Sequence, residues 1–180
     1  MSRAELQYRQ LTPKDIAPDM LRDFNRYQEV TKSWRKQNGA WLLVDNPHII
    51  QWDDAKKQAL IADFKQILHS GGVLFAAYDG EKLAGFGGMD GNFIGSVGQY
   101  LWLVVLHVSY EYRGCGIGRA LFRMIADNAR QRGAPKLYIS ANSSQESQGF
   151  YRAVGCVHTS EIIPALFEAE PFDVHMEFGL

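Results

Sequence analysis

The sequence lacks the features that place a protein outside the ordinary globular class. Its 180 residues contain only two cysteines, Cys115 and Cys156, which are too few to predict a disulfide framework. No apolar run approaches the roughly 20 residues that a membrane-spanning helix needs, and the first residues lack the apolar centre of a signal peptide. We therefore expect a cytoplasmic protein with no membrane partner.

The chain also lacks an excess of charge of either sign. Its 19 Lys and Arg residues are balanced by 20 Asp and Glu residues, and the net charge of −1 gives no general reason to expect nucleic acid as a partner. There is no internal repeat and no low-complexity run. Because hydrophobic residues make up 46% of the chain and charged residues 22%, we expect residues 1–180 to form a single domain with a sizeable core.

The segment around which the rest can be arranged begins with an apolar run, Leu101–Val108. It is too short to span a membrane and rich in branched and aromatic residues, which is typical of a strand covered on both faces. A glycine-rich turn follows at Arg113–Arg119, and apolar residues then recur at three- and four-residue spacing up to Gln131. That period predicts an amphipathic helix, which Gly133 and Pro135 end.

The glycine-rich turn predicts a phosphate site. A strand that turns directly into a helix leaves several main-chain N–H groups unpaired, at the positive end of the helix dipole. Gly114, Gly116 and Gly118 remove the side chains that would keep a phosphate away from these groups. Arg113 and Arg119 can add charge-assisted hydrogen bonds. We therefore expect a ligand that carries phosphate, most simply a pyrophosphate.

Two common phosphate-binding loops do not fit this turn. The dinucleotide fingerprint needs a third glycine where this chain has Arg119 or Leu121, depending on the starting glycine. A P-loop needs Gly-Lys-Ser/Thr, which is absent. The pattern that remains is Arg-x-x-Gly-x-Gly after an apolar strand. It resembles the acetyl-coenzyme A loop of the GNAT superfamily of N-acetyltransferases.

A second motif further along the chain supports this resemblance. Lys136–Asn142 has the composition of a strand, and Ser144–Gly155 that of a helix. Phe150 and Tyr151, which precede the glycine at the end of this segment, resemble the pair that carries the family's usual tyrosine acid. Together the two motifs cover about a third of the chain. One position departs from the family pattern, because Ser144 stands where the family often has asparagine.

The resemblance implies an α/β (α+β) fold with one domain. In the GNAT fold a central mixed sheet of about seven strands, mostly antiparallel, is flanked by about four helices. The residue patterns predict the remaining elements in a compatible order: an edge strand over 5–11, helices over 18–31 and 53–69, a hairpin over 73–89, a loop over 90–98, a strand over 156–160, a connection over 161–171 and a strand over 172–178. The last strand alternates, with Phe172, Val174, Met176 and Phe178 expected to face inward.

The segment from Lys32 to Trp52 has no clear period, yet it contains Trp34, Trp41 and Trp52. A surface connection this aromatic is unusual. One interpretation is a lid or substrate wall over the domain. The other is a satellite hydrophobic cluster beneath a long loop. The sequence does not decide between them.

The resemblance implies an N-acetyltransferase that moves an acetyl group from acetyl-coenzyme A directly to a primary amine. We expect a small-molecule amine as partner, acetyl-coenzyme A as co-substrate and no metal. The alternatives are a protein or peptide N-acetyltransferase, a non-catalytic acyl-coenzyme A sensor, and an α/β nucleotide-binding domain of another kind. A homodimer is allowed, since the C-terminal strand can pair between subunits in relatives of this family.

The resemblance also assigns the co-substrate contacts. The pyrophosphate is expected over the turn, and the pantetheine arm is expected along the end of the apolar strand, where a bulge can aim an N–H at the thioester oxygen. Asn142 and Ser144 are candidates for pantetheine contacts, although Ser144 also fits a plain helix N-cap. The expected co-substrate residues are Leu106, His107, Val108, Arg113, Gly114, Cys115, Gly116, Ile117, Gly118, Arg119, Asn142, Ser144 and Tyr151.

Tyr151 is the expected general acid. A phenol with an ordinary pKa of about 10 stays protonated at neutral pH and can give its proton to a leaving thiolate. The structural alternative is a tyrosine packed on the core with its hydroxyl at the rim. The expected general base is His107, whose ordinary pKa suits it to accept a proton. A buried structural histidine is the alternative, with Glu29, Asp90, Glu111 or a water chain then serving as base.

The acceptor is the least defined part of the site. Arg26 and Arg35 can hold a carboxylate, and Trp34 or Trp41 can face a cationic or aromatic group. Surface pairing and packing explain the same residues equally well. From this set and the base candidates we take Glu29, Trp34 and Arg35 as the expected substrate residues.

Overall fold

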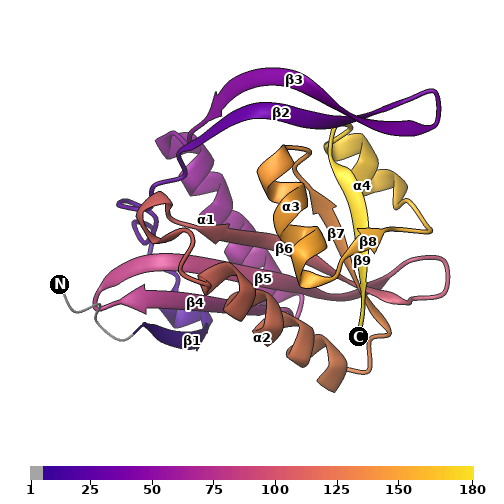
Figure 1. The fold of residues 1–180 in the computed structure, drawn as a ribbon. Helices are drawn as coiled ribbons and strands as arrows, with labels where there is room; N and C mark the ends of the chain where they lie inside the picture. Colours follow the sequence, from indigo (N-terminus) through magenta and orange to yellow (C-terminus); the bar gives the residue numbers. More distant parts are fainter. Residues whose placement is uncertain (1–5) are drawn as a thin grey trace.

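The structure, a computed structural model, describes residues 6–180 and is built on a seven-stranded sheet (Figure 1). The strands lie in the order β1-β4-β5-β6-β7-β9-β8, and every neighbouring pair is antiparallel except β6 with β7. This confirms the mixed, mostly antiparallel sheet. The strands are β1 (Gln7–Leu11), β4 (Val73–Asp79), β5 (Lys82–Ile94), β6 (Tyr100–Val108), β7 (Lys136–Ala141), β8 (Val157–His158) and β9 (Val174–Gly179).

Helices cover both faces of the sheet (Figure 1). They are α1 (Asp54–His69), α2 (Ile117–Gln131), α3 (Gln145–Val154) and α4 (Pro164–Ala169), with short 3-10 turns η1 (Pro13–Asp15) and η2 (Tyr110–Tyr112). None of the described helices is long and apolar enough to cross a membrane. The expected helices over 53–69, 117–131 and 144–154 are therefore confirmed, and so is the predicted hairpin of β4 and β5.

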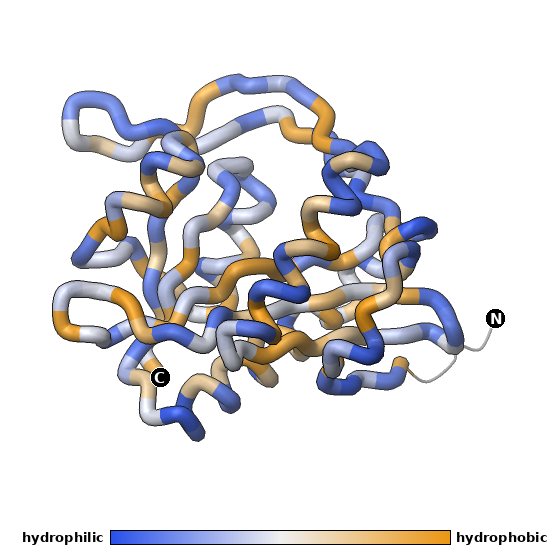
Figure 2. Tube along the Cα trace, turned by 180° about the vertical axis from the view of Figure 1, so that it is seen from behind, coloured by the Kyte–Doolittle hydropathy of each residue, from blue (hydrophilic) through white to orange (hydrophobic). Residues whose placement is uncertain are grey.

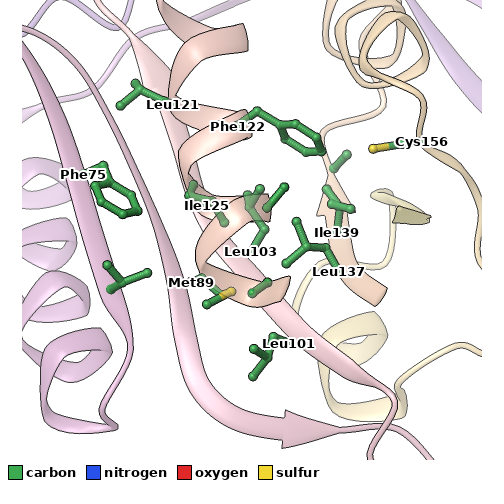
Figure 3. Close-up of a cluster of buried hydrophobic side chains, with 14 of the residues drawn as sticks. Phe75, Met89, Leu101, Leu103, Leu121, Phe122, Ile125, Leu137, Ile139 and Cys156 are labelled. Atoms are coloured by element: carbon green, nitrogen blue, oxygen red, sulfur yellow. The ribbon is translucent and has the colours of Figure 1, made fainter. Parts of the chain in front are cut away.

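Two hydrophobic cores hold the helices to the sheet. On one face, α2 directs Leu121, Phe122 and Ile125 onto strand residues such as Leu103 and Ile139 (Figure 3). On the other face, α1 buries its apolar side against β1, β4 and β5. Figure 2 shows hydrophobic residues along the central strands and hydrophilic residues at the tip of a hairpin that arches over the domain. The central strand β6 is thus covered on both sides, as its apolar run predicts.

Glycines in β5 allow α2 to lie close to the sheet. A methyl group on Gly85 would come within 2.8 Å of Ile117 Cγ2, and one on Gly87 within 2.9 Å of Ile125 Cδ1. The space above these glycines is filled by side chains of α2. Ile117 is the first residue of the helix, so this packing fixes where α2 begins.

The predicted helix over 18–31 is wrong. Residues 18–23 form turns, and the strand β2 (Gln28–Gln37) begins where the helix was expected to end. Leu21 and Phe24 are buried beneath α1, so their spacing reflects a turn rather than a helix. Asn25 then fixes the chain, because its N–H donates to Ser109 Oγ at 3.0 Å and its carbonyl accepts from Tyr110 N at 2.9 Å. Those bonds redirect the backbone before a helix can continue.

The tryptophan-rich segment is a β-hairpin, not an irregular loop. β2 pairs with β3 (Ala40–Ile50) in a separate two-stranded sheet that arches over α1 and α3 (Figure 1). Its turn is Asn38-Gly39, with φ values of 50° and 82°. Left-handed Asn-Gly pairs are typical of two-residue hairpin turns. This signal is visible in the sequence and predicts the hairpin, although the segment was interpreted as a connection.

The chain after α3 and the strand β5 differ from the expectation. The connection over 161–171 contains α4, and Phe172, expected inward, is 72% exposed because β9 begins after it. β9 pairs with β7 along one edge and with β8 along part of the other. β5 also continues to Ile94, into the predicted loop over 90–98. The strand over 156–160 is confirmed by β8, and that over 5–11 by β1, except that residue 5 lies outside the described residues.

We expect Gly85→Ala to lower the free energy of unfolding by about 1–3 kcal/mol, because the added methyl overpacks the contact between β5 and α2. Urea denaturation measures this change. Gly149→Ala is the control, since a methyl there meets nothing within 4 Å and replaces a glycine inside α3. That variant should gain about 0.5–1 kcal/mol. Unchanged stability of Gly85→Ala would contradict the close packing.

Candidate active site

The candidate site lies where β6 and β7 stop pairing. These parallel strands are in register from Tyr100 with Lys136 to Leu103 with Ile139, although both strands continue further. A cavity of about 740 Å³ opens beyond the last pair, with β6 on one side and β7 and α3 on the other. Its size is that of a small-molecule site. The parting of the strands therefore creates a cleft in the middle of the sheet.

The β6 edge of this cleft carries main-chain groups available for pairing. Ser109 N donates to Ala84 O in the neighbouring strand β5 at 2.9 Å. Since successive residues of an antiparallel strand direct their main-chain groups to alternate sides, Leu106 and Val108 direct theirs away from β5, toward the cleft. Both residues line the cavity. Leu103 pairs with Met89 and Val105 with Gly88, so Val104 is one extra residue in β6. A bulge is therefore present just before this stretch.

The glycine-rich turn forms one end of the cavity. Gly114 and Gly116 have φ values of 74° and 82°, and methyl groups added to them would meet nothing within 4 Å. Gly116 is also the N-cap of α2 and offers no side chain to cap the helix. Within residues 6–180, no hydrogen bond uses the main-chain N–H groups of residues 114–119 as donors. The turn thus combines open space, free donors and a helix N-terminus, which together favour an anion.

Tyr151 lies across the cavity, on α3. Burial raises the pKa of its phenol above the ordinary value, and the nearby Cys156 and Asp173 raise it further. Asp173 is itself a half-buried carboxyl, and its pKa is raised to about 6 by burial even though Ser140 donates a hydrogen bond to it. The hydroxyl of Tyr151 is therefore protonated throughout the neutral pH range.

Comparison with known proteins identifies this arrangement. The model of the acetyltransferase (GNAT) family matches residues 24–156, which is most of the chain. The chain belongs to the GNAT acetyltransferase family. The family expected from the glycine-rich turn and the second motif is thus confirmed, and with it the GNAT fold. Comparison with curated proteins gives no match.

Solved structures show the same fold over the whole chain. A nourseothricin acetyltransferase has a TM-score of 0.71 at 22% identity, covering 97% of this chain and 98% of its own. A candidate streptothricin acetyltransferase from Bacillus anthracis, in complex with acetyl coenzyme A, has a TM-score of 0.72 at 14% identity, covering 98% and 99%. The PaiA N-acetyltransferase from Thermoplasma acidophilum, in complex with coenzyme A, has a TM-score of 0.61 at 15% identity, covering 98% and 99%.

Most of the co-substrate residues expected from the sequence meet at this cavity. Those that line it are Leu106, His107, Val108, Arg113, Gly114, Gly116, Ile117, Gly118, Arg119, Asn142 and Tyr151. Cys115 and Ser144 do not. The Cys115 thiol lies within 3.4 Å of Arg113 O and packs against the core. Ser144 is fully buried as the N-cap of α3 and accepts a hydrogen bond from Ser147 N, in agreement with the capping alternative.

His107 does not have the pKa expected of a general base in this acetyltransferase. Burial and, to a smaller extent, the positive charges of Arg26, Lys56 and Arg113 together lower its pKa to about 3. Its ring packs edge-on against Trp52, with the centroids 4.7 Å apart. The imidazole is therefore neutral at neutral pH and a weak base, so the expected pKa range was wrong.

The other base candidates differ in position. Glu29 lines the cavity from β2 and is exposed. Glu111 accepts hydrogen bonds from Asn25 and Ser109, which lower its pKa. Asp90 accepts hydrogen bonds from the main chain and side chain of Asn92, and it is not among the lining residues. Of these three carboxylates, only that of Glu29 borders the cavity.

The hairpin contributes to the cavity through its base rather than through its tryptophans. The guanidinium carbon of Arg152 lies 4.4 Å from the centroid of the Trp34 ring, and Trp41 stacks on His158. Arg35 donates to Ser143 Oγ at 2.5 Å and lies over the Phe172 ring. Neither Trp34 nor Arg35 borders the cavity, so the packing alternative describes them.

Sequence reasoning gave too little weight to the residues just before and at the start of β2. Arg26, Tyr27 and Gln28 all line the cavity. The predicted helix did not place them together, because consecutive residues of a helix point in different directions. Recognition of the Asn38-Gly39 turn would have set the start of the hairpin and brought these residues to the cleft.

We expect the imidazole of His107 to remain neutral from about pH 8 to about pH 5, because its pKa is about 3. NMR shifts of the ring, assigned with His107→Gln, measure this. In the unfolded chain the imidazole takes up a proton at about pH 6.5. The free energy of unfolding therefore falls as the pH decreases below that value. His107→Gln should weaken this pH dependence. A ring titration near neutrality would contradict the assignment.

Proposed function

We propose that this acetyltransferase transfers an acetyl group from acetyl-coenzyme A directly to a primary amine of a small molecule. The observation that carries the proposal is the cleft between β6 and β7, with free main-chain donors at one end and a protonated tyrosine opposite. No nucleophilic side chain is needed for direct transfer. The fold of the solved relatives is consistent with this assignment but, at identities below 25%, does not determine the substrate.

The residues present fit the co-substrate. A pyrophosphate matches the open glycine turn, where free N–H groups and the N-terminus of α2 favour negative charge. The pantetheine arm carries amide groups, which match the main-chain donors and acceptors that Leu106 and Val108 direct into the cleft. Asn142, at the end of β7, lines the opposite side, while its own Oδ1 accepts from Ser144 N at 3.0 Å. Acetyl-coenzyme A thus accounts for both edges of the cleft.

The chemistry requires one bond to form and one to break. The neutral amine nitrogen attacks the thioester carbonyl carbon, the carbon–sulfur bond breaks, and the thiolate leaves. Tyr151 supplies its hydroxyl proton to the thiolate. The hydroxyl carries this proton at neutral pH because burial raises the pKa of the phenol. The amine gives up a proton to water in the open cavity or to Glu29, because neutral His107 is too weak a base. Tyr151 then regains its proton from solvent, so protons balance over the cycle.

A small amine is preferred as acceptor because the cavity is bounded on its acceptor side by the chain before β2 and the base of the hairpin. The nourseothricin and streptothricin acetyltransferases with the same fold are named for small molecules, which supports this preference. A protein or peptide acceptor needs a groove that lets an extended chain pass. A non-catalytic acyl-coenzyme A sensor retains the glycine turn but does not need Tyr151.

We expect acetyl-coenzyme A to bind the purified protein in calorimetry and to raise its melting temperature, whereas NAD and ATP should do neither. A ligand at 100 times its Kd stabilises the native state by about 2.7 kcal/mol. Release of free thiol with a panel of small amines then measures turnover. Binding without turnover of any small amine or peptide would favour the sensor. Absence of acetyl-coenzyme A binding would refute the proposed function.

We expect Tyr151→Phe to lower kcat by about 100-fold to 10,000-fold, the usual contribution of a positioned acid, while the Kd of acetyl-coenzyme A stays within a few-fold. The hydroxyl is lost and the ring that packs beside Phe122 is retained. Tyr78→Phe is the matched control, since Tyr78 lies in β4 beside Arg9 and does not line the cavity. Full activity of Tyr151→Phe would show that another group supplies the proton.

A further inference from the structure

Arg26 is a buried cation without a protein partner. Its side chain lines the cavity, the residue is only 9% exposed, and Nη1 is buried with no hydrogen-bond acceptor. Among the described residues, none accepts a hydrogen bond from any nitrogen of this guanidinium, and none forms an ion pair with it. An unpaired buried charge is costly, so its retention indicates a partner that is not part of the chain.

The surroundings of Arg26 also favour an anion. The guanidinium lies over the ring of Trp52, 5.8 Å from its centroid, and that ring separates it from the core. The charges that act on this group and on the neighbouring His107 are positive. Burial and, after it, the charge of Arg113 lower the pKa of Arg26 to about 10, and Lys56 acts together with both arginines on His107. The nearby Glu111 is occupied by Asn25 and Ser109. This part of the cavity is therefore positive, and no carboxylate of residues 6–180 forms an ion pair with Arg26.

We infer that Arg26 binds a carboxylate of the acceptor, so that the substrate class is an amine that also carries a carboxyl group. A guanidinium and a carboxylate form two parallel hydrogen bonds, and burial strengthens them. Glu29, exposed at the same cavity, is suited to attract the ammonium end. This inference rests on the proposed function and defines its acceptor.

The phosphates of the co-substrate are the rival source of negative charge. They match the glycine turn, whose helix α2 packs on the opposite face of the sheet from α1. Arg26 packs with Trp52, which belongs with Phe24 and Phe86 to the α1 face. The guanidinium therefore packs on the α1 side of the cleft, although the charge of Arg113, at the start of the turn, still reaches it. A variant of Arg26 should change acceptor binding and leave co-substrate binding unchanged.

The test compares matched amines. Thiol release is measured with amino acids, with ω-amino acids such as β-alanine, and with the carboxamide of each compound. Binding of the same compounds to the coenzyme A-saturated protein is followed by thermal shift, which does not depend on turnover. We expect at least one carboxylate to be preferred over its carboxamide by about 10-fold or more in kcat/KM, as a charge-assisted pair predicts.

Two variants locate the preference. Arg26→Met should lower kcat/KM for the carboxylate to the value for the carboxamide. The kcat/KM for the carboxamide should stay within about 3-fold of the wild-type value. The calorimetric Kd of acetyl-coenzyme A should be unchanged. Because it removes an unpaired buried charge at similar volume, its melting temperature should equal or exceed that of the wild type. Arg22→Gln is the matched control, since Arg22 lies in the same segment but is exposed and paired with Asp19. It should behave as the wild type.

Other outcomes overturn the inference without removing the proposed function. Carboxamides used as well as carboxylates, or an equal loss for both in Arg26→Met, would show that Arg26 does not read a carboxylate. A weaker acetyl-coenzyme A Kd in Arg26→Met would assign the residue to the phosphates. A lower melting temperature with unchanged preference would assign it a structural role. If no compound of the panel is turned over or stabilises the protein while acetyl-coenzyme A still binds, the acceptor inference alone fails.

Discussion

The separation of β6 and β7 after Leu103 and Ile139 is the constraint on which the site depends. Main-chain groups in the middle of a sheet are normally paired, and leaving them unpaired is costly unless another group replaces the missing strand. Here the two strands cannot close, because α2 and α1 hold β6 from opposite faces and α3 is capped at Ser144, beyond the end of β7. The cleft is thus a product of core packing. Because packed helices hold its edges in place, little ordering is needed when a chain with amide groups enters it.

The charges at the cavity follow from the same packing. The ring of His107 is enclosed by Trp52 and Phe86, and this enclosure together with the neighbouring cations keeps it neutral. Burial raises the pKa of Tyr151, whereas for Arg26 it leaves a cation without a counter-ion. The cation is an unfavourable arrangement for the folded chain alone, because a buried charge without a partner is costly. Such a group in a cavity is the expected sign of a site in which stability has been exchanged for function.

The sequence predicted the centre of this protein better than its periphery. The strand, glycine turn and helix from Leu101 to Gln131 were predictable because burial, turn geometry and helical period agree there. The segment over 18–31 was not, because Leu21 and Phe24 have a helical spacing that tertiary hydrogen bonds at Asn25 override. The pKa of His107 was beyond sequence reasoning for a related reason, since its neighbours come from separate segments of the chain. The hairpin of β2 and β3 was predictable from the Asn38-Gly39 pair, which is a stronger signal than the lack of a clear hydrophobic period.

The hairpin of β2 and β3 has a consequence for how this protein can change. It forms a sheet of its own. It joins the domain at the loop before α3, where Trp34 N donates to Ser143 O and Ser33 pairs with Ser144, and through the contacts of its tryptophans with Arg152 and His158. Its cross-strand contacts are local in sequence, so it can accept substitutions without disturbing the seven-stranded sheet. The hairpin, which supplies Gln28 and Glu29 to the cavity, and the seven-stranded sheet are therefore separable parts of the protein. A lineage, or an engineer, can diversify the first by exchanging one ribbon while inheriting the second intact.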